Sequence, residues 1–129
     1  MKYLLDTTVI VNHLRGKKPI KIDFLENGCA VSIITQAELF YGAYKSSNSL
    51  ANLKKVKAMF LDLGIEVITL NEEIIEQYAK IKTKLEKEGK RLDEFDLLIA
   101  ATAIEKNLIL VSDNLSHFKR ISSLKVISQ

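Results

Sequence analysis

The sequence predicts an α/β fold, a three-layer α/β/α sandwich with a central, mainly parallel sheet of four to five strands. Short apolar segments rich in branched residues alternate with longer segments of helical spacing along the whole chain. Such alternation favours parallel strands joined by right-handed helical crossovers. No internal repeat, low-complexity tract or linker divides the chain. We therefore expect a single domain over residues 1–129.

The chain opens with a predicted buried strand over residues 2–5, which ends at an acidic turn of Asp6, Thr7 and Thr8. Three apolar residues in a row precede this polar stop, and a short helix is expected over residues 9–15. In open α/β sheets the carboxyl ends of the strands face the ligand crevice. Asp6 would lie there, and a carboxylate that ends a buried strand is costly unless it has a partner. Asp6 is therefore the first candidate site residue.

The later elements follow the same alternation, with glycine, asparagine and serine at several boundaries. Residues 65–70 alternate between apolar and polar side chains, which places that strand near an edge of the sheet. Residues 97–104 are apolar on nearly every side, so their helix is expected in the interior, against the sheet. In chain order we expect a helix over 22–25, a strand over 30–34, helices over 35–44 and 50–63, a strand over 65–70, helices over 71–85 and 93–104, a strand over 108–111, one helical turn over 115–118 and a strand over 124–127.

The composition is that of a soluble globular protein, with 47% hydrophobic and 27% charged residues. The longest nearly apolar run, residues 97–104, is far shorter than the roughly 20 residues that span a membrane. Asp6 interrupts the apolar start of the chain, which argues against a signal peptide. We therefore expect a cytoplasmic protein that makes no membrane contact.

Cysteine and histidine offer no recognisable metal site. The single cysteine, Cys29, has no partner for a disulfide or a zinc pair, and its apolar neighbours predict a buried, inert thiol. His13 and His117 stand far apart and in no ligand spacing. We expect neither histidine to be catalytic or to bind a metal.

Four acidic residues fall at corresponding places in this scheme. Each follows a strand or opens a helix at the predicted carboxyl edge of the sheet: Asp6, Glu38, Asp96 and Asp113. Carboxylates gathered there repel one another and need a positive partner, and oxygen-only ligands favour Mg²⁺ or Mn²⁺ over zinc. Such ions activate water and neutralise phosphate, alone or as a pair roughly 3.5–4 Å apart. We assign Asp6 and Asp96 as metal ligands, and Glu38 as a ligand or as the acceptor that orients the attacking water. The hydroxyls of Thr7 and Ser112 could support these ligands from a second shell.

Ordinary structural roles could also explain three of these acids. Glu38 fits a capping box with Thr35, in which each side chain binds a backbone N–H at the start of a helix. Asp96 follows Asp93 by three residues, so one acid could cap a helix while the other favours its positive end. Asp113 and the asparagine after it form a common turn pair.

The chain carries four short segments in order: Asp6 with Thr7, residues 38–42, residues 96–103, and residues 111–114 with Phe118. Together they resemble the successive motifs of PIN-domain ribonucleases, and the similarity is greatest to the small single-domain toxins of the VapC type. The resemblance implies a PIN-like fold and assigns metal-binding positions to Asp6, Glu38 and Asp96. The fourth position holds Asp or Asn in the family, four residues before an aromatic. That spacing selects Asn114, while the neighbouring Asp113 is the only acid available.

The resemblance also implies an activity and partners. The family hydrolyses RNA phosphodiester bonds with Mg²⁺ or Mn²⁺, is neutralised by a small antitoxin protein whose tail enters the active-site groove, and usually forms homodimers. The net charge of +3 rises to +7 when the four acids are set aside, which suits RNA. Candidate contacts to the RNA backbone are Lys17, Lys18, Lys45, Lys54, Lys55, Lys57, Lys90, Arg91, Lys119 and Arg120. In contrast, we expect solvated side chains at Lys80, Lys82, Lys84 and Lys87.

Two other PIN-like functions stay open: an RNA-processing nuclease without a toxin role, and a catalytically inactive module that binds RNA or protein. Other classes with an acid after the first strand fit less well. A phosphatase of the haloacid-dehalogenase type needs a second Asp where Thr8 stands. A receiver domain needs adjacent acids near its start and a lysine after a late strand, and this chain has neither in those places. The chain also has no glycine-rich phosphate loop.

Overall fold

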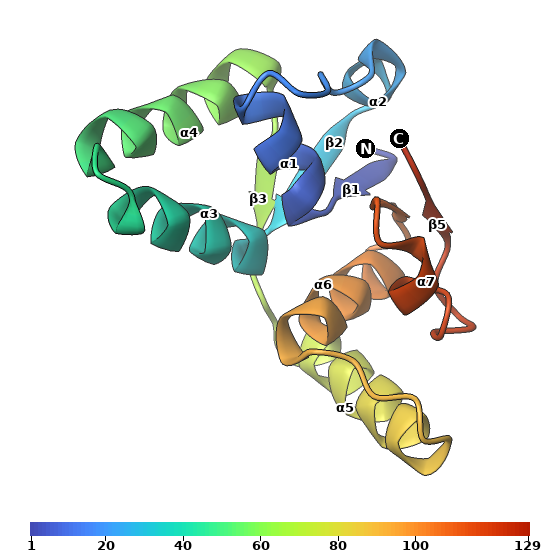
Figure 1. Cartoon of the computed structure of the whole chain (residues 1–129). Helices are drawn as coiled ribbons and strands as arrows, with labels where there is room; N and C mark the ends of the chain where they lie inside the picture. Colours follow the sequence, from blue (N-terminus) through green and yellow to red (C-terminus); the bar gives the residue numbers. More distant parts are fainter.

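The computed structural model describes residues 1–129 and contains a five-stranded sheet in the order β3-β2-β1-β4-β5 (Figure 1). Every neighbouring pair of strands is parallel, so the predicted mainly parallel sheet is in fact wholly parallel. The predicted edge position of the third strand is confirmed. The strands are β1 (Tyr3–Leu5), β2 (Cys29–Ser32), β3 (Glu66–Ile68), β4 (Ile109–Val111) and β5 (Val126–Ile127).

Helices cover both faces of this sheet, which confirms the predicted three layers. The helices α3 and α4 pack together as one hairpin, and α5 and α6 form a second hairpin on the other side of the molecule (Figure 1). The helices are α1 (Thr7–Leu14), α2 (Ile22–Glu26), α3 (Ile33–Lys45), α4 (Ser49–Leu63), α5 (Glu72–Lys87), α6 (Glu94–Glu105) and α7 (Leu115–Phe118). No helix combines the length and the apolar character that crossing a membrane requires.

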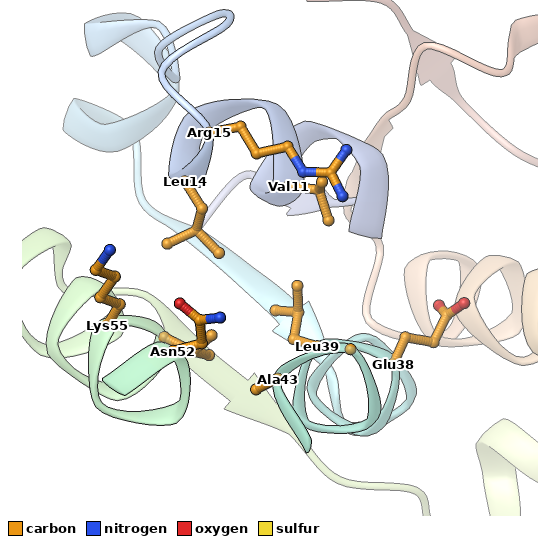
Figure 2. Close-up of a pocket in the computed structure, with 10 residues that line it drawn as sticks. Val11, Leu14, Arg15, Glu38, Leu39, Ala43, Asn52 and Lys55 are labelled. Carbon is orange, nitrogen blue, oxygen red and sulfur yellow. The ribbon is translucent and has the colours of Figure 1, made fainter. Parts of the chain in front are cut away.

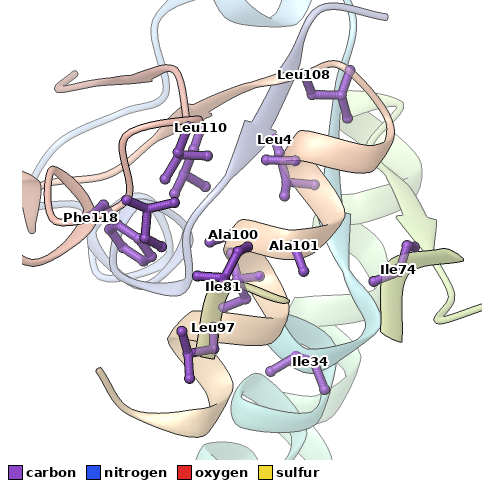
Figure 3. Packing of buried hydrophobic residues seen from close by; sticks show 14 of the residues in the cluster. Leu4, Ile34, Ile74, Ile81, Leu97, Ala100, Ala101, Leu108, Leu110 and Phe118 are labelled. Carbon is purple, nitrogen blue, oxygen red and sulfur yellow. The ribbon is translucent and has the colours of Figure 1, made fainter. Parts of the chain in front are cut away.

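The core divides into two clusters because successive strand residues point to opposite faces. Tyr3 and Leu5 of β1 pack on the side of α1 and α4, in a cluster that also contains the buried Cys29. Leu4, between them, joins the opposite cluster with α5, α6 and Phe118 (Figure 3). The helix α6 has six of its twelve residues buried, all between Leu97 and Ala103, as the apolar sequence of this segment predicted. Burial raises the pKa of the Cys29 thiol to about 11, so the thiol stays neutral and unreactive.

The start of α3 differs from the prediction. The residues Ile33 and Ile34 were expected at the end of a strand but form the first turn of the helix. Ser32 ends β2 and caps α3, since its hydroxyl accepts a hydrogen bond of 3.1 Å from the backbone N–H of Ile34. The predicted capping box of Thr35 and Glu38 is therefore wrong, because Thr35 already lies inside the helix.

The order of the strands creates a switch point beside β1. The chain adds β2 and β3 on one side of β1 and then returns through the α5–α6 hairpin to place β4 on the other side. The connections that leave β1 and β4 therefore depart in opposite directions. A crevice opens at the carboxyl ends of these two strands, where ligands bind in open α/β sheets.

Candidate active site

A polar pocket of about 300 Å³ lies at this switch point, and no hydrophobic residue lines it. All four acids predicted from the sequence lie in this pocket, although they come from segments up to 107 residues apart. The lining consists of Asp6, Thr7, Thr8, Glu38, Asp96, Asp113 and Asn114. Thr8 belongs to the predicted acidic turn, but it is the one lining residue to which sequence reasoning gave no site role.

Asp6 is the most buried acid of the pocket, with only 5% of its surface exposed. It caps α1, where one carboxylate oxygen accepts a hydrogen bond of 2.9 Å from the backbone N–H of Thr7. The other oxygen accepts one of 2.7 Å from the Ser112 hydroxyl. Burial raises the pKa of Asp6, Asp113 raises it further by repulsion, and these two hydrogen bonds oppose the rise. Ser112 thus supports Asp6 directly, as the sequence suggested.

Glu38 of α3 is held in place by Thr7 of the neighbouring helix α1. The Thr7 hydroxyl donates a hydrogen bond of 2.7 Å to the Glu38 carboxylate and also lies 3.0 Å from the Thr35 hydroxyl. Thr35 is fully buried one helical turn before Glu38, so it contributes to the same network. Sequence reasoning assigned this threonine to a cap and missed its place beside the site.

Asp96 lies in the first turn of α6 and is half-buried. Its pKa is raised to about 6, first by burial and then by repulsion from Asp6, Asp93 and Glu38, while His117 acts in the opposite direction. Asp93 occupies the cap position of α6, but its side chain makes no capping hydrogen bond. The raised pKa of Asp96 therefore comes first from its burial and second from repulsion by the neighbouring acids.

Asp113 and Asn114 both line the pocket, so the two candidates for the fourth position both face the other acids. Asp113 accepts a hydrogen bond of 3.3 Å from the side chain of Asn12 on α1. The backbone N–H of Asn114 donates to the Ser112 hydroxyl at 3.0 Å, and its side-chain amide lies 2.6 Å from Nδ1 of His117. His117 was not predicted in this region, although it lies only three residues after Asn114, because it has no metal-ligand spacing with His13.

The donors of the pocket are all oxygen atoms of carboxylate, amide or hydroxyl groups, which is the set that hard divalent cations prefer. As the side chains stand, no three of the acids lie close enough to hold one ion between them. Burial and mutual repulsion raise the pKa of Asp6 and of Asp96, and a bound divalent cation would offset both effects, so the donor chemistry fits such an ion.

Comparison with known proteins identifies the family of this chain. The family model of the PIN domain matches residues 3–124, so the chain belongs to the PIN-domain family. Within that family it groups with the VapC ribonucleases. Ribonuclease VapC2 of Haemophilus influenzae is 36% identical over 129 residues, which cover 97% of this chain and 96% of the relative.

Solved structures agree with this assignment. VapBC2 of Rickettsia felis, bound to a DNA fragment from its promoter, is 30% identical with a TM-score of 0.88 over 100% of this chain and 99% of that one. DNA-bound VapBC of Salmonella typhimurium is 29% identical with a TM-score of 0.91 over 99% of this chain and 98% of that one. The fold of this chain is therefore that of the VapC subunits.

Proposed function

We propose that this chain is a metal-dependent endoribonuclease that hydrolyses RNA phosphodiester bonds and acts as the toxin of a toxin–antitoxin pair. The observation that carries the proposal is Asp6, a buried carboxylate at the switch point that shares one pocket with three further acids. Burying such a group and surrounding it with like charge is costly, so a binding or catalytic purpose is the economical explanation. Membership of the VapC group supports the same reaction.

Mg²⁺ or Mn²⁺ would be held by Asp6, Glu38 and Asp96, with Asp113 or Asn114 in the fourth position. A bound ion supplies Lewis acidity toward the phosphate and lowers the pKa of water. The hydroxyls of Ser112 and Thr7 orient the carboxylates of Asp6 and Glu38 through the hydrogen bonds already described. Glu38 either binds the ion or accepts a hydrogen bond from the attacking water, which aligns that water with the phosphate.

The partners follow from the same relationship. The solved neighbours named above are VapBC complexes, which supports a cognate antitoxin for this chain. The first place to seek it is a short reading frame directly upstream. We also infer a homodimer in the cytoplasm. Growth arrest on expression of the chain, relieved by coexpression of that reading frame, would distinguish a toxin from an RNA-processing enzyme.

Cleavage of total cellular RNA tests the reaction. The purified protein, free of any antitoxin, is incubated with Mg²⁺ or Mn²⁺ and, in parallel, with EDTA. We expect discrete fragments that need the metal and that disappear in the Asp96→Asn variant. Undiminished cleavage by both Asp6→Asn and Asp96→Asn would show that the acid pocket is not the active site. A folded protein that binds the metal but cleaves no RNA would favour the inactive binding module.

A further inference from the structure

A second hollow adjoins the acid pocket, and we call it the α1–α4 groove. It has a volume of about 360 Å³, lies between α1, α3 and α4, and shares Glu38 with the acid pocket (Figure 2). Half of its ten lining residues are hydrophobic, whereas the acid pocket has none. The half-buried Leu14 lines the groove from α1, whereas Leu39 of α3 and Val56 of α4 line it with only 5% and 4% of their surface exposed. A ligand that reaches from the acids into the groove thus passes from a charged to an apolar environment.

Two cations flank the groove. Arg15 extends from the end of α1 toward the Glu38 side, and Lys55 of α4 lies toward the opposite side (Figure 2). Glu38 is the only acidic residue of the lining. The single salt bridge of the chain joins Lys82 and Glu94, so neither Arg15 nor Lys55 is paired with an acid. Unpaired cations at both ends of an apolar surface suit an anionic ligand with an apolar body.

Asn52 adds an oriented hydrogen-bond acceptor to the lining. The Ser46 hydroxyl donates to the backbone carbonyl of Ala43 at 2.6 Å, so it can only accept from the Asn52 amide nitrogen, which lies 2.8 Å away. This hydrogen bond fixes which end of the amide is nitrogen. The Asn52 carbonyl oxygen, in contrast, receives no hydrogen bond from the chain, and it remains available to an N–H group of a ligand.

We propose that the α1–α4 groove binds the nucleotide next to the scissile phosphate of a single-stranded RNA segment. The base lies on the apolar surface, its edge donates to Asn52, and Arg15 and Lys55 contact the flanking phosphates. A peptide segment could also cover apolar residues, but the two unpaired cations favour a polyanion. This inference rests on the proposed ribonuclease function and adds to it a substrate-binding subsite.

Gly42 allows the groove to be filled without changing its walls. It lines the groove from α3, and a Cβ atom at this position would meet nothing within 4 Å. Its backbone is helical, so a side chain introduces no strain and improves helix propensity by roughly 0.5–1 kcal/mol. Gly42→Leu therefore places an isobutyl group in the groove of a folded protein. Ala79→Leu, on an exposed face of α5, is the matched control.

The test measures binding of a fluorescein-labelled, random-sequence 12-nucleotide RNA by anisotropy. All proteins carry Asp96→Asn and are kept in EDTA, so that the RNA stays intact. Loss of one bound base predicts about tenfold weaker binding for Gly42→Leu and no change for Ala79→Leu. Lys55→Gln should weaken binding about threefold and reduce the salt slope by about 0.7, since one phosphate contact is lost. Lys80→Gln, which removes the same charge from α5, should do neither.

Cleavage of total RNA by the variants without Asp96→Asn separates this inference from the proposed function. We expect Gly42→Leu to slow cleavage about tenfold and Asn52→Leu to change the preferred cleavage positions. If Gly42→Leu binds and cleaves RNA as the unmodified protein does, the inference is wrong and the function stands. RNA binding that Gly42→Leu weakens, without any cleavage, would support the groove and contradict the function. Normal RNA binding with loss of the coexpressed antitoxin would assign the groove to protein and overturn the inference.

Discussion

The Ser112 hydroxyl donates a hydrogen bond of 2.7 Å to the Asp6 carboxylate, joining residues that lie 106 positions apart in the chain. Each residue directly follows its strand, and the backbone N–H of Asp6 also donates to the Val111 carbonyl at 2.9 Å. The pairing between β1 and β4 thus extends to the first residues of the pocket. The sheet itself fixes the position of Asp6, which is the rigid support that a catalytic carboxylate needs.

Ser112→Ala tests this support. The variant leaves one oxygen of a buried carboxylate without its donor, so the free energy of unfolding should fall by roughly 1–3 kcal/mol. The same loss raises the pKa of Asp6 further, because the hydrogen bond favours the charged form. Cleavage should fall about tenfold, and the acid limb of its pH–rate profile should move to higher pH. Urea denaturation and RNA cleavage between pH 5 and 9 measure the two effects.

Ser32→Ala is the control for that variant. Ser32 is as fully buried as Ser112 and follows the same pattern at the end of β2, but its hydroxyl caps α3 and does not contact an acid of the pocket. It should lose roughly 1 kcal/mol of stability and keep the pH–rate profile. An equal shift of the profile in both variants would mean that general loosening of the sheet, rather than the Asp6 hydrogen bond, controls the acid limb.

Asp96→Asn should stabilise the protein in EDTA at neutral pH. The folded-state pKa of about 6 lies above the ordinary value of 3.8, so between these values the folded state binds more protons than the unfolded state. Stability therefore decreases as the pH rises through this window and stays lower above it. After allowance for solvent screening at this half-buried site, we expect the variant to gain about 1–2 kcal/mol at pH 7.5.

Thermal unfolding at two pH values checks this sign. At pH 4 the carboxyl group of Asp96 is largely protonated in the folded state, so the advantage of Asp96→Asn should shrink there. Addition of Mn²⁺ at pH 7.5 should raise the melting temperature of the unmodified protein more than that of the variant, since a bound ion stabilises only the state that holds it. A variant less stable than the unmodified protein in EDTA at pH 7.5 would contradict the repulsion that we assign to Asp96.

The order of strands and helices could be predicted from the sequence, because the apolar residues of each element recur at the spacing of a strand or of a helix. The acids at one sheet edge followed from that order, since parallel strands end on the same side. The boundary at Ser32 could not be predicted in this way. Ile33 and Ile34 have the β-branched character of a strand, and only the Ser32 hydroxyl, acting as a cap, starts the helix before them.

Contacts between segments that lie far apart in the sequence could not be predicted either. Thr7 and Glu38 are 31 residues apart, and a local capping box explained Glu38 equally well from sequence alone. The α1–α4 groove was also not predicted, because Leu14, Leu39 and Val56 have the spacing of core residues, and Leu39 and Val56 are indeed buried. A hollow beside such residues depends on how three helices meet, which no local sequence pattern indicates.

Thr7→Val should weaken the site without removing a proposed ligand. Valine keeps the volume of threonine but cannot donate to the Glu38 carboxylate, which then loses its 2.7 Å hydrogen bond. Removing such an orienting group typically costs 10- to 100-fold in metal affinity or activity. Thr7→Ser retains the hydroxyl and should cleave RNA at close to the original rate. Mn²⁺ titration by calorimetry, together with RNA cleavage, distinguishes the two, and similar losses in both variants would assign the effect to packing.

Asp113→Ala and Asn114→Ala together decide the fourth metal position. Asp113 lies close enough to raise the pKa of Asp6 by repulsion, so its carboxylate adds negative charge to the ion-binding region. The side-chain amide of Asn114 is engaged with His117. We therefore expect Asp113→Ala to weaken Mn²⁺ binding about tenfold or more and Asn114→Ala to weaken it less. Calorimetric titration of Mn²⁺ at constant pH measures both affinities. A larger loss in Asn114→Ala would assign the position to Asn114, and would mean that its amide turns away from His117 when the ion binds.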